Sequence, residues 1–135
     1  MTTLHLGSDS EYIKIRFPTA LGREGWVEAR VELSVNAFHG SITPCFEVAD
    51  FEQFLSELKA LHETLHGRAD LSPREQQFVL ALVIDPTGHI LVTGEAWSRA
   101  TYENKLQFEF VLDQTFLSEP IGQLQSILGA RETDA

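Results

Sequence analysis

The sequence has little cysteine, little positive charge and no long apolar run, and each shortage argues against a class of protein. The single cysteine, Cys45, has no partner for an internal disulfide, which is typical of a reducing compartment. Lysine and arginine total 10 against 20 aspartates and glutamates, so the formal net charge is −10. Because nucleic acids and anionic membranes attract positive surfaces, we expect neither as a direct partner.

The start of the chain and its apolar runs add two further expectations. The first residues, MTTLHLGSDSEY, lack the basic and apolar regions of a signal peptide. No stretch approaches the ~18 apolar residues of a membrane span, so a cytoplasmic protein is expected. The chain has 135 residues, of which 43% are hydrophobic, enough for one domain with its own core. We expect residues 1–135 to form that domain, with residues 1–10 and 131–135 frayed.

The most informative stretch is residues 106–124, LQFEFVLDQTFLSEPIGQL. Large apolar residues at Leu106, Phe108, Phe110 and Leu112 alternate with their neighbours, which predicts a strand with one buried face. The side-chain oxygens of residues 113–115 can then cap a helix that starts just after them. Residues 46–61, FEVADFEQFLSELKAL, repeat this order of strand, acidic break and apolar helix face.

The remaining alternation predicts an α+β fold in which a β-β-β-α unit occurs twice. Helical spacing of apolar residues predicts a first helix over residues 50–66, with Asp50 and Gln53 as a capping box and Gly67 as its C-cap. Burial of both helices is simplest against one face of a mainly antiparallel, six-stranded curved sheet. The other predicted strands are residues 12–17, 26–37, 41–48, 77–84 and 89–97.

One segment matches a zinc-enzyme motif. His62-Glu63-Thr64-Leu65-His66 has the form H-E-x-x-H, which on a helix places two imidazoles over one zinc ion with the glutamate as general base. The motif falls in the last turn before Gly67, however, and no convincing third ligand follows. We therefore expect no metal, cofactor or catalytic residue and interpret Cys45 as a structural residue. A small zinc-dependent hydrolase using His62, Glu63 and His66 remains the alternative.

The uncovered face of the predicted sheet is the candidate binding surface. If Phe108 and Phe110 face the helices, the alternate residues of that strand and its neighbours face outward. This outer side combines apolar side chains with carboxylates, as recognition surfaces do, although an inert solvated sheet is the simpler interpretation. The predicted partner-binding residues are Glu28, Glu32, Leu91, Glu95, Trp97, Glu109 and Val111.

Several of these segments resemble the WapI-family immunity proteins. The resemblance covers residues 26–124 and rests mainly on GHIxVxGE at residues 88–95 and FEFxxDQT at residues 108–115. It implies a small cytoplasmic bacterial protein that neutralises the toxin domain encoded beside it, and it supplies no catalytic residues. It does not identify the toxin.

The composition agrees with that implication. An acidic protein with no coherent catalytic set suits an inhibitor that blocks the active site of a basic toxin domain, to which its carboxylates would guide it. Two alternatives stay open at this point: the zinc hydrolase and a non-catalytic structural or oligomerisation module. The sequence leaves the oligomeric state undetermined.

Overall fold

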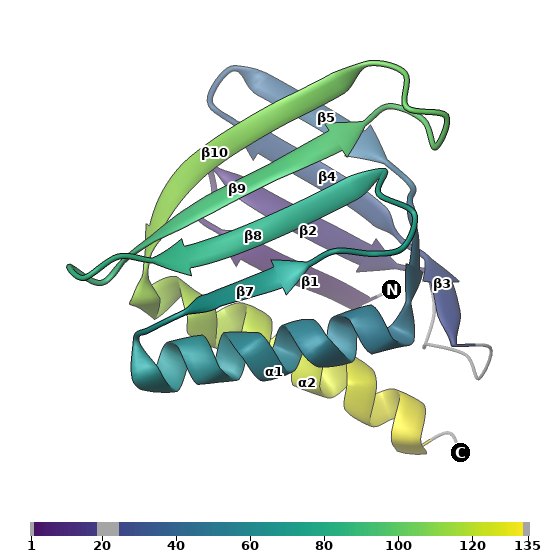
Figure 1. The fold of residues 1–135 in the computed structure, drawn as a ribbon. Coiled ribbons are helices and arrows are strands. Elements are labelled where there is room, and N and C mark those ends of the chain that lie inside the picture. Colours follow the sequence, from purple (N-terminus) through teal and green to yellow (C-terminus); the bar gives the residue numbers. More distant parts are fainter. Residues whose placement is uncertain (1, 19–24, 134–135) are drawn as a thin grey trace.

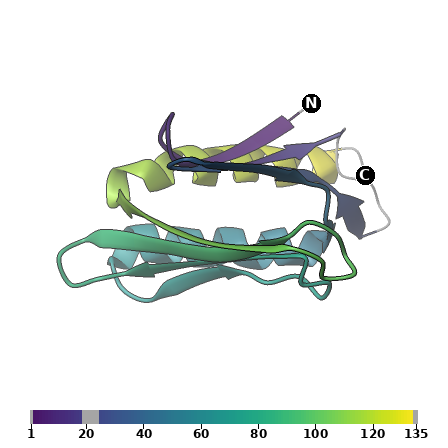
Figure 2. The same cartoon turned by 90° about the horizontal axis from the view of Figure 1, so that it is seen from above.

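The strands form two four-stranded antiparallel sheets that face each other (Figures 1 and 2). The computed structural model describes residues 2–18 and 25–133. The N-terminal sheet has the order β1-β2-β4-β5 and comprises β1 (Thr2–Gly7), β2 (Tyr12–Phe17), β4 (Arg30–Val35) and β5 (Phe38–Ile42). The C-terminal sheet has the order β10-β9-β8-β7 and comprises β7 (Arg68–Leu71), β8 (Phe78–Ile84), β9 (His89–Trp97) and β10 (Lys105–Asp113). A two-stranded ribbon pairs β3 (Trp26–Glu28) with β6 (Cys45–Glu47).

Two α-helices lie side by side, and each runs along the edge of one sheet (Figure 1). The first, α1 (Val48–Thr64), runs beside β7, and the second, α2 (Ser118–Thr133), runs beside β1. A 3-10 turn, η1 (Gln114–Leu117), joins β10 to α2. Because the helices occupy the β7 and β1 edges, the outer faces of β8, β9 and β10 stay uncovered (Figure 1). Among the described residues, no helix has the length and apolar character needed to span a membrane.

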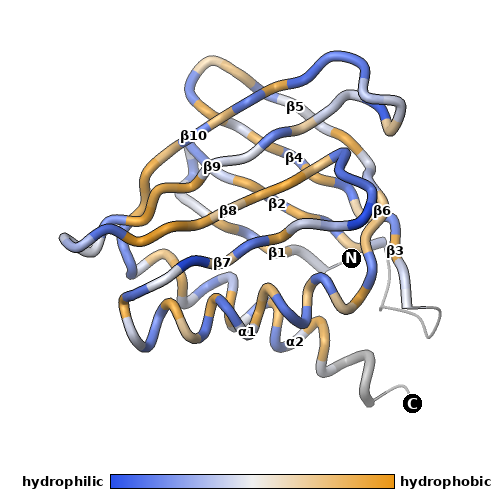
Figure 3. The backbone as a smooth tube through the Cα atoms, in the orientation of Figure 1, coloured by the Kyte–Doolittle hydropathy of each residue, from blue (hydrophilic) through white to orange (hydrophobic). Residues whose placement is uncertain are grey.

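The inner faces of both sheets and one stripe of each helix share a single apolar core. The alternation of β10 is confirmed, because Phe108, Phe110 and Leu112 are buried and the residues between them are exposed. The predicted stripe of the first helix is confirmed at Phe51, Phe54, Leu58 and Leu61. β8 is hydrophobic along its length, while the segments that flank it are hydrophilic (Figure 3).

The α+β class and the mainly antiparallel pairing are confirmed, but the single six-stranded sheet is replaced by two sheets and a ribbon. Two strands were missed. Residues 2–7, expected to be frayed, form β1 with Leu4 and Leu6 buried, and residues 68–71, to which no strand was assigned, form β7. The helices therefore lie along the edges of two sheets rather than on one face of a single sheet. Alternation shows which side chains are buried but not which strands share a sheet.

Element boundaries differ where a strand changes its pairing partner. The predicted strand 26–37 divides at Ala29, because β3 pairs with β6 whereas β4 pairs with β2 and β5. The predicted strand 41–48 is likewise interrupted at Pro44, between β5 and β6. The first helix begins earlier than predicted, with Glu47 as N-cap and Asp50 completing the capping box. It also ends earlier, at the left-handed C-cap Leu65 rather than at Gly67.

Candidate functional site

The outer face of the C-terminal sheet consists of the side chains that alternate with its buried residues. Strand register places them in rows that cross the sheet from β7 to β10. We use "outer face" for this set alone: Arg68, Asp70, Val79, Ala81, Val83, Leu91, Thr93, Glu95, Trp97, Lys105, Gln107, Glu109 and Val111. The rows differ in chemistry, so the face has an apolar end, a hollow centre and an aromatic end.

The apolar end is a row of three aliphatic side chains. Val83 on β8 is opposite Leu91 on β9, which is opposite Val111 on β10. Their side chains are 40%, 41% and 57% exposed, respectively. Directly paired aliphatic residues form a continuous strip on neighbouring strands rather than scattered apolar points. Such a strip, open to solvent and bordered by polar side chains, is typical of a protein-binding surface.

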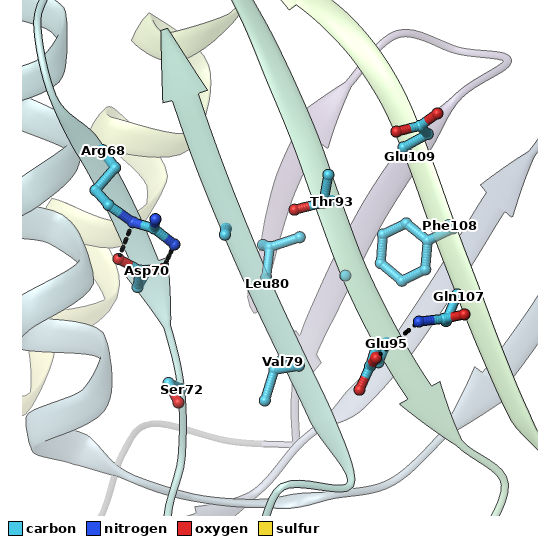
Figure 4. A pocket seen from close by; sticks show the side chains of 12 residues that line it. Arg68, Asp70, Ser72, Val79, Leu80, Thr93, Glu95, Gln107, Phe108 and Glu109 are labelled. Atoms are coloured by element: carbon cyan, nitrogen blue, oxygen red, sulfur yellow. Dashed lines mark hydrogen bonds and ion pairs between the residues drawn. The ribbon is translucent and has the colours of Figure 1, made fainter.

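The centre of the face is a hollow of about 600 Å³ (Figure 4). Its floor is the next row, in which small side chains, Ala81 and Thr93, separate Asp70 on β7 from Glu109 on β10. Arg68 donates two hydrogen bonds to Asp70, at 2.9 and 2.7 Å. On the opposite side of the hollow, Gln107 on β10 donates to Glu95 on β9 at 3.0 Å, and Glu109 lies further along β10 (Figure 4). Carboxylates are therefore the prevailing charged groups around the hollow.

The aromatic end is built around Trp97. The ring of Tyr102 packs edge-on against Trp97, with centroids 5.3 Å apart, and Tyr102 is 50% exposed. The Lys105 ammonium lies 5.2 Å from the centre of the Trp97 ring and 3.6 Å from a Glu95 carboxylate oxygen. The arrangement presents a large aromatic surface beside the hollow.

The loop that carries Tyr102 is held by its own hydrogen bonds. The Ser98 amide donates to the carbonyls of Glu103 and Asn104, at 3.1 and 2.9 Å, and the Tyr102 amide donates to the Arg99 carbonyl at 2.9 Å. Tyr102 and Asn104 adopt positive φ angles of 62° and 48°. A left-handed conformation is uncommon for a bulky residue such as tyrosine and persists only where the surroundings enforce it. The loop therefore fixes the position of the exposed ring.

The structure brings together the predicted residues of β9 and β10 but not those of the earlier strands. Leu91, Glu95, Trp97, Glu109 and Val111 all lie on the outer face. In contrast, Glu28 lies on β3, and Glu32 lies on β4 of the N-terminal sheet.

The local environment of Glu32 also differs from the prediction. The Arg16 Nε–H donates to both carboxylate oxygens of Glu32, at 3.1 and 3.2 Å, and Arg30 Nε lies 3.4 Å away. Its charge is therefore largely compensated within its own sheet. The prediction of one continuous surface containing Glu28 and Glu32 was wrong, because it assumed a single sheet.

Two residues at this surface, Val83 and Tyr102, were not predicted from the sequence. Val83 lies in the continuous apolar run FVLALVI, in which alternation cannot distinguish the inner face from the outer one. Tyr102 lies in a polar loop, and only the folded loop shows its contact with Trp97. Pairing each outer residue of β9 with a position on β8 would have identified Val83.

A second hollow, of about 550 Å³, lies at the turn between β8 and β9 and contains His66, His89, Asp85 and Asp113. The Thr87 hydroxyl donates to Asp85 at 2.6 Å, and this hydrogen bond lowers the pKa of Asp85. The Thr115 hydroxyl and amide likewise donate to Asp113 and lower its pKa. Each carboxylate thus stabilises a local turn, and Asp113 is the N-cap of η1.

The helix containing His62, Glu63 and His66 does not supply the geometry of a zinc motif. α1 ends at Thr64 and Leu65 adopts a left-handed conformation, so His66 lies outside the helix. The two histidines therefore do not occupy successive turns of one helix, as the motif requires. Within residues 2–18 and 25–133, no group of three or more histidine, cysteine or acidic side chains could hold a metal ion. Burial raises the pKa of the Cys45 thiol, and so do the carboxylates of Glu75 and Glu28, which disfavours a reactive thiolate.

The family comparison agrees with the segments identified in the sequence. Residues 5–130 match the model of the immunity protein WapI-like family. The match extends beyond the resembling segments to β1 at one end and α2 at the other. No curated protein matches the chain.

Two solved structures match the chain at 10% sequence identity. The crystal structures of Trypanosoma bruciei MRP1/MRP2 have a TM-score of 0.54, covering 93% of this chain and 77% of that chain. The CdiA-CT/CdiI toxin and immunity complex from Enterobacter cloacae has a TM-score of 0.47, covering 83% of this chain and 97% of that chain. At this identity, the likeness to MRP1/MRP2 concerns the fold alone.

Proposed function

The chain belongs to the immunity protein WapI-like family, and from this premise we propose that it neutralises a cognate toxin domain by binding it through the outer face of the C-terminal sheet. Membership of an immunity protein family supports a binding role and not an enzymatic one. Neither the family match nor the geometry of α1 supports the zinc hydrolase alternative.

The choice of the outer face as the binding surface rests on one observation. The outer face combines an exposed aliphatic row, a hollow and a fixed aromatic pair on adjacent strands that no helix covers. Protein interfaces favour such apolar and aromatic side chains. Within this proposal, Leu91, Val111 and Trp97 supply the apolar and aromatic contacts, and Glu95 and Glu109 supply the charges.

Charge supplies the second part of the proposal. The chain has a formal net charge of −10, so its field attracts a basic partner over distances longer than direct contact. Many toxins that act on phosphate-containing substrates need a positive active-site cleft. We propose that the acidic face approaches such a cleft and blocks access of the substrate.

We also propose that residues 1–135 act as one domain in the cytoplasm. Support for one domain comes from the apolar core, which includes residues from Leu4 on β1 to Ile127 on α2 in one cluster. Support for the compartment comes from the single cysteine, which has no intramolecular disulfide partner.

The experiment that tests this function uses the toxin domain encoded by the adjacent gene. Cells expressing that domain should survive when this chain is co-expressed, and the two purified proteins should form a complex on size-exclusion chromatography. An unrelated acidic protein of similar size serves as the control for charge alone. Death of the co-expressing cells, together with separate elution of the two proteins, would reject the proposed function. Survival without a complex would reject direct binding.

A further inference from the structure

The hollow at the centre of the outer face exists because one cross-strand row has small residues in its middle and acidic residues at its ends. Asp70, Ala81, Thr93 and Glu109 are successive partners across β7, β8, β9 and β10. Three strand spacings of about 4.8 Å separate the two carboxylate-bearing positions by roughly 14 Å. Ala81 and Thr93 line the hollow and have smaller side chains than the acidic residues, which leaves an open floor between the acidic ends.

The charges around this floor are not balanced. Arg68 is the single cation among the residues that line the hollow, against the three carboxylates of Asp70, Glu95 and Glu109. Arg68 is already engaged by Asp70 at 2.7 Å, and Lys105, at the edge of the face, is 3.6 Å from Glu95. Among the described residues, no cation lies within ion-pair distance of Glu109, which is exposed. The Glu109 side of the hollow therefore lacks positive charge.

A ligand in the hollow would lie between the apolar end and the aromatic end of the outer face. Leu91 and Trp97 are six residues apart on the same side of β9, or about 20 Å along the strand. The aliphatic row lies beyond one side of the hollow, and the Trp97–Tyr102 pair lies beyond the other. A segment that crosses the face thus meets an apolar contact, an acidic hollow and an aromatic contact in that order.

We propose that the hollow receives a lysine or arginine side chain of the toxin domain, and that the neighbouring side chains of the toxin cover the aliphatic row and the aromatic pair. This inference rests on the proposed function and adds the chemistry of the partner. The aliphatic stem of a long cationic side chain can lie on Ala81 and Thr93 while its charged end reaches Glu109. An arginine can in addition form paired hydrogen bonds with a carboxylate.

Charge complementarity favours this occupant over a second copy of the chain. A symmetric pair joined through the outer face would bring the surplus carboxylates of two such faces into one interface. Like charges facing each other in an interface are strongly unfavourable. A basic partner instead compensates the carboxylates that the sheet leaves without a cation.

The test measures equilibrium binding to the toxin domain that the wild-type chain neutralises. Glu109→Lys reverses the charge at the hollow, and Ala81→Leu fills its floor without changing charge. Glu52→Lys, at an exposed position of α1, matches the charge change of Glu109→Lys and is the control. We expect Glu109→Lys and Ala81→Leu each to weaken binding about tenfold or more, while Glu52→Lys stays within about twofold of wild type. Thermal melts of each variant establish that it is folded before binding is measured.

Three results would overturn the inference while leaving neutralisation of the toxin intact. Wild-type affinity in both hollow variants would show that the hollow is not occupied. Equal weakening of toxin binding by Glu109→Lys and Glu52→Lys would show that the effect depends on net charge alone and not on the hollow. A dimer of the free chain that is disrupted by Ala81→Leu, detected by light scattering, would assign the face to a second copy. Failure of the wild-type chain to neutralise the toxin would instead reject the proposed function.

Discussion

The ring of Phe108 on β10 occupies the space that a side chain at Gly94 on β9 would need. A Cβ atom placed on Gly94 would lie 2.5 Å from Cζ of Phe108 and 2.6 Å from the carbonyl oxygen of Val79. Gly94 and Phe108 are direct partners in the sheet, so the absence of a side chain at Gly94 leaves room for the Phe108 ring beside β9. Close packing of the two strands therefore depends on glycine at this position.

Gly94→Ala should therefore destabilise the fold. The added methyl group meets both a backbone oxygen and a ring in the core, and overpacking of this kind costs about 1–3 kcal/mol. Urea titration measures the difference in unfolding free energy. Gly122→Ala on α2 is the matched control, because the space around that Cβ is open and alanine favours a helix by about 1 kcal/mol. Unchanged stability in Gly94→Ala would mean that Phe108 is free to move aside.

Truncation of the core should cost much more than truncation of the outer face. Leu58 is 0% exposed and Phe110 is 4% exposed, so Leu58→Ala and Phe110→Ala should each lose about 2–5 kcal/mol. Val111→Ala, next to Phe110 but on the outer face, should change the unfolding free energy by less than about 0.5 kcal/mol. Similar losses for Phe110→Ala and Val111→Ala in urea titration would contradict the assignment of the two faces.

Stability at acidic pH should depend on Asp113. Hydrogen bonds from the Thr115 hydroxyl and amide lower the pKa of Asp113 in the folded state. A folded pKa below the unfolded value of about 3.9 stabilises the fold above that value, and the contribution is lost as pH falls through the folded pKa. Asp113→Asn should therefore melt at a lower temperature than wild type at pH 7, with a difference that shrinks below about pH 4. A difference that stays constant from pH 7 to pH 2 would contradict a role for the charge.

The carboxylates of the outer face should affect association with the toxin, which the aromatic pair should not. Replacing Glu95 and Glu109 by lysine should slow association and flatten its dependence on salt, because these carboxylates contribute to the field that guides encounter. Trp97→Ala should instead speed dissociation, at a cost of about 2 kcal/mol or more, since it removes a contact. Stopped-flow and surface-binding kinetics separate the two effects, with Glu52 and Glu63 replaced by lysine as the charge-matched control. An association rate of the wild-type chain that is the same at low and high salt would contradict steering.

The sequence predicted the parts of the fold that local pattern controls. Strict alternation from Leu106 to Leu112 identified β10 and its inner face, and helical spacing identified the buried stripe of α1. Sheet membership could not be predicted in the same way, because it depends on contacts between distant strands. β1 shows this: Leu4 and Leu6 are buried only because Thr2–Gly7 pairs with Tyr12–Phe17.

The candidate site likewise could be predicted only where it depends on local pattern and not on contacts between distant strands. The predicted residues on β9 and β10 share one face of a sheet because those strands are consecutive and directly paired. Glu32 was grouped with them by its own alternation on β4, although that strand belongs to the other sheet. The hollow could not be predicted, since it depends on the register that aligns Ala81 and Thr93 between Asp70 and Glu109.

The most direct test of the account is the dissociation constant of the toxin complex with Leu91→Asp, compared with Phe38→Asp. Both positions are exposed and apolar, 41% and 63% respectively, but Leu91 belongs to the aliphatic row of the outer face and Phe38 lies on β5 of the N-terminal sheet. If the outer face binds the toxin, Leu91→Asp should weaken the complex about thirtyfold or more, and Phe38→Asp should leave it within about twofold of wild type. Loss of binding in Phe38→Asp with wild-type affinity in Leu91→Asp would place the interface on the N-terminal sheet and contradict the account.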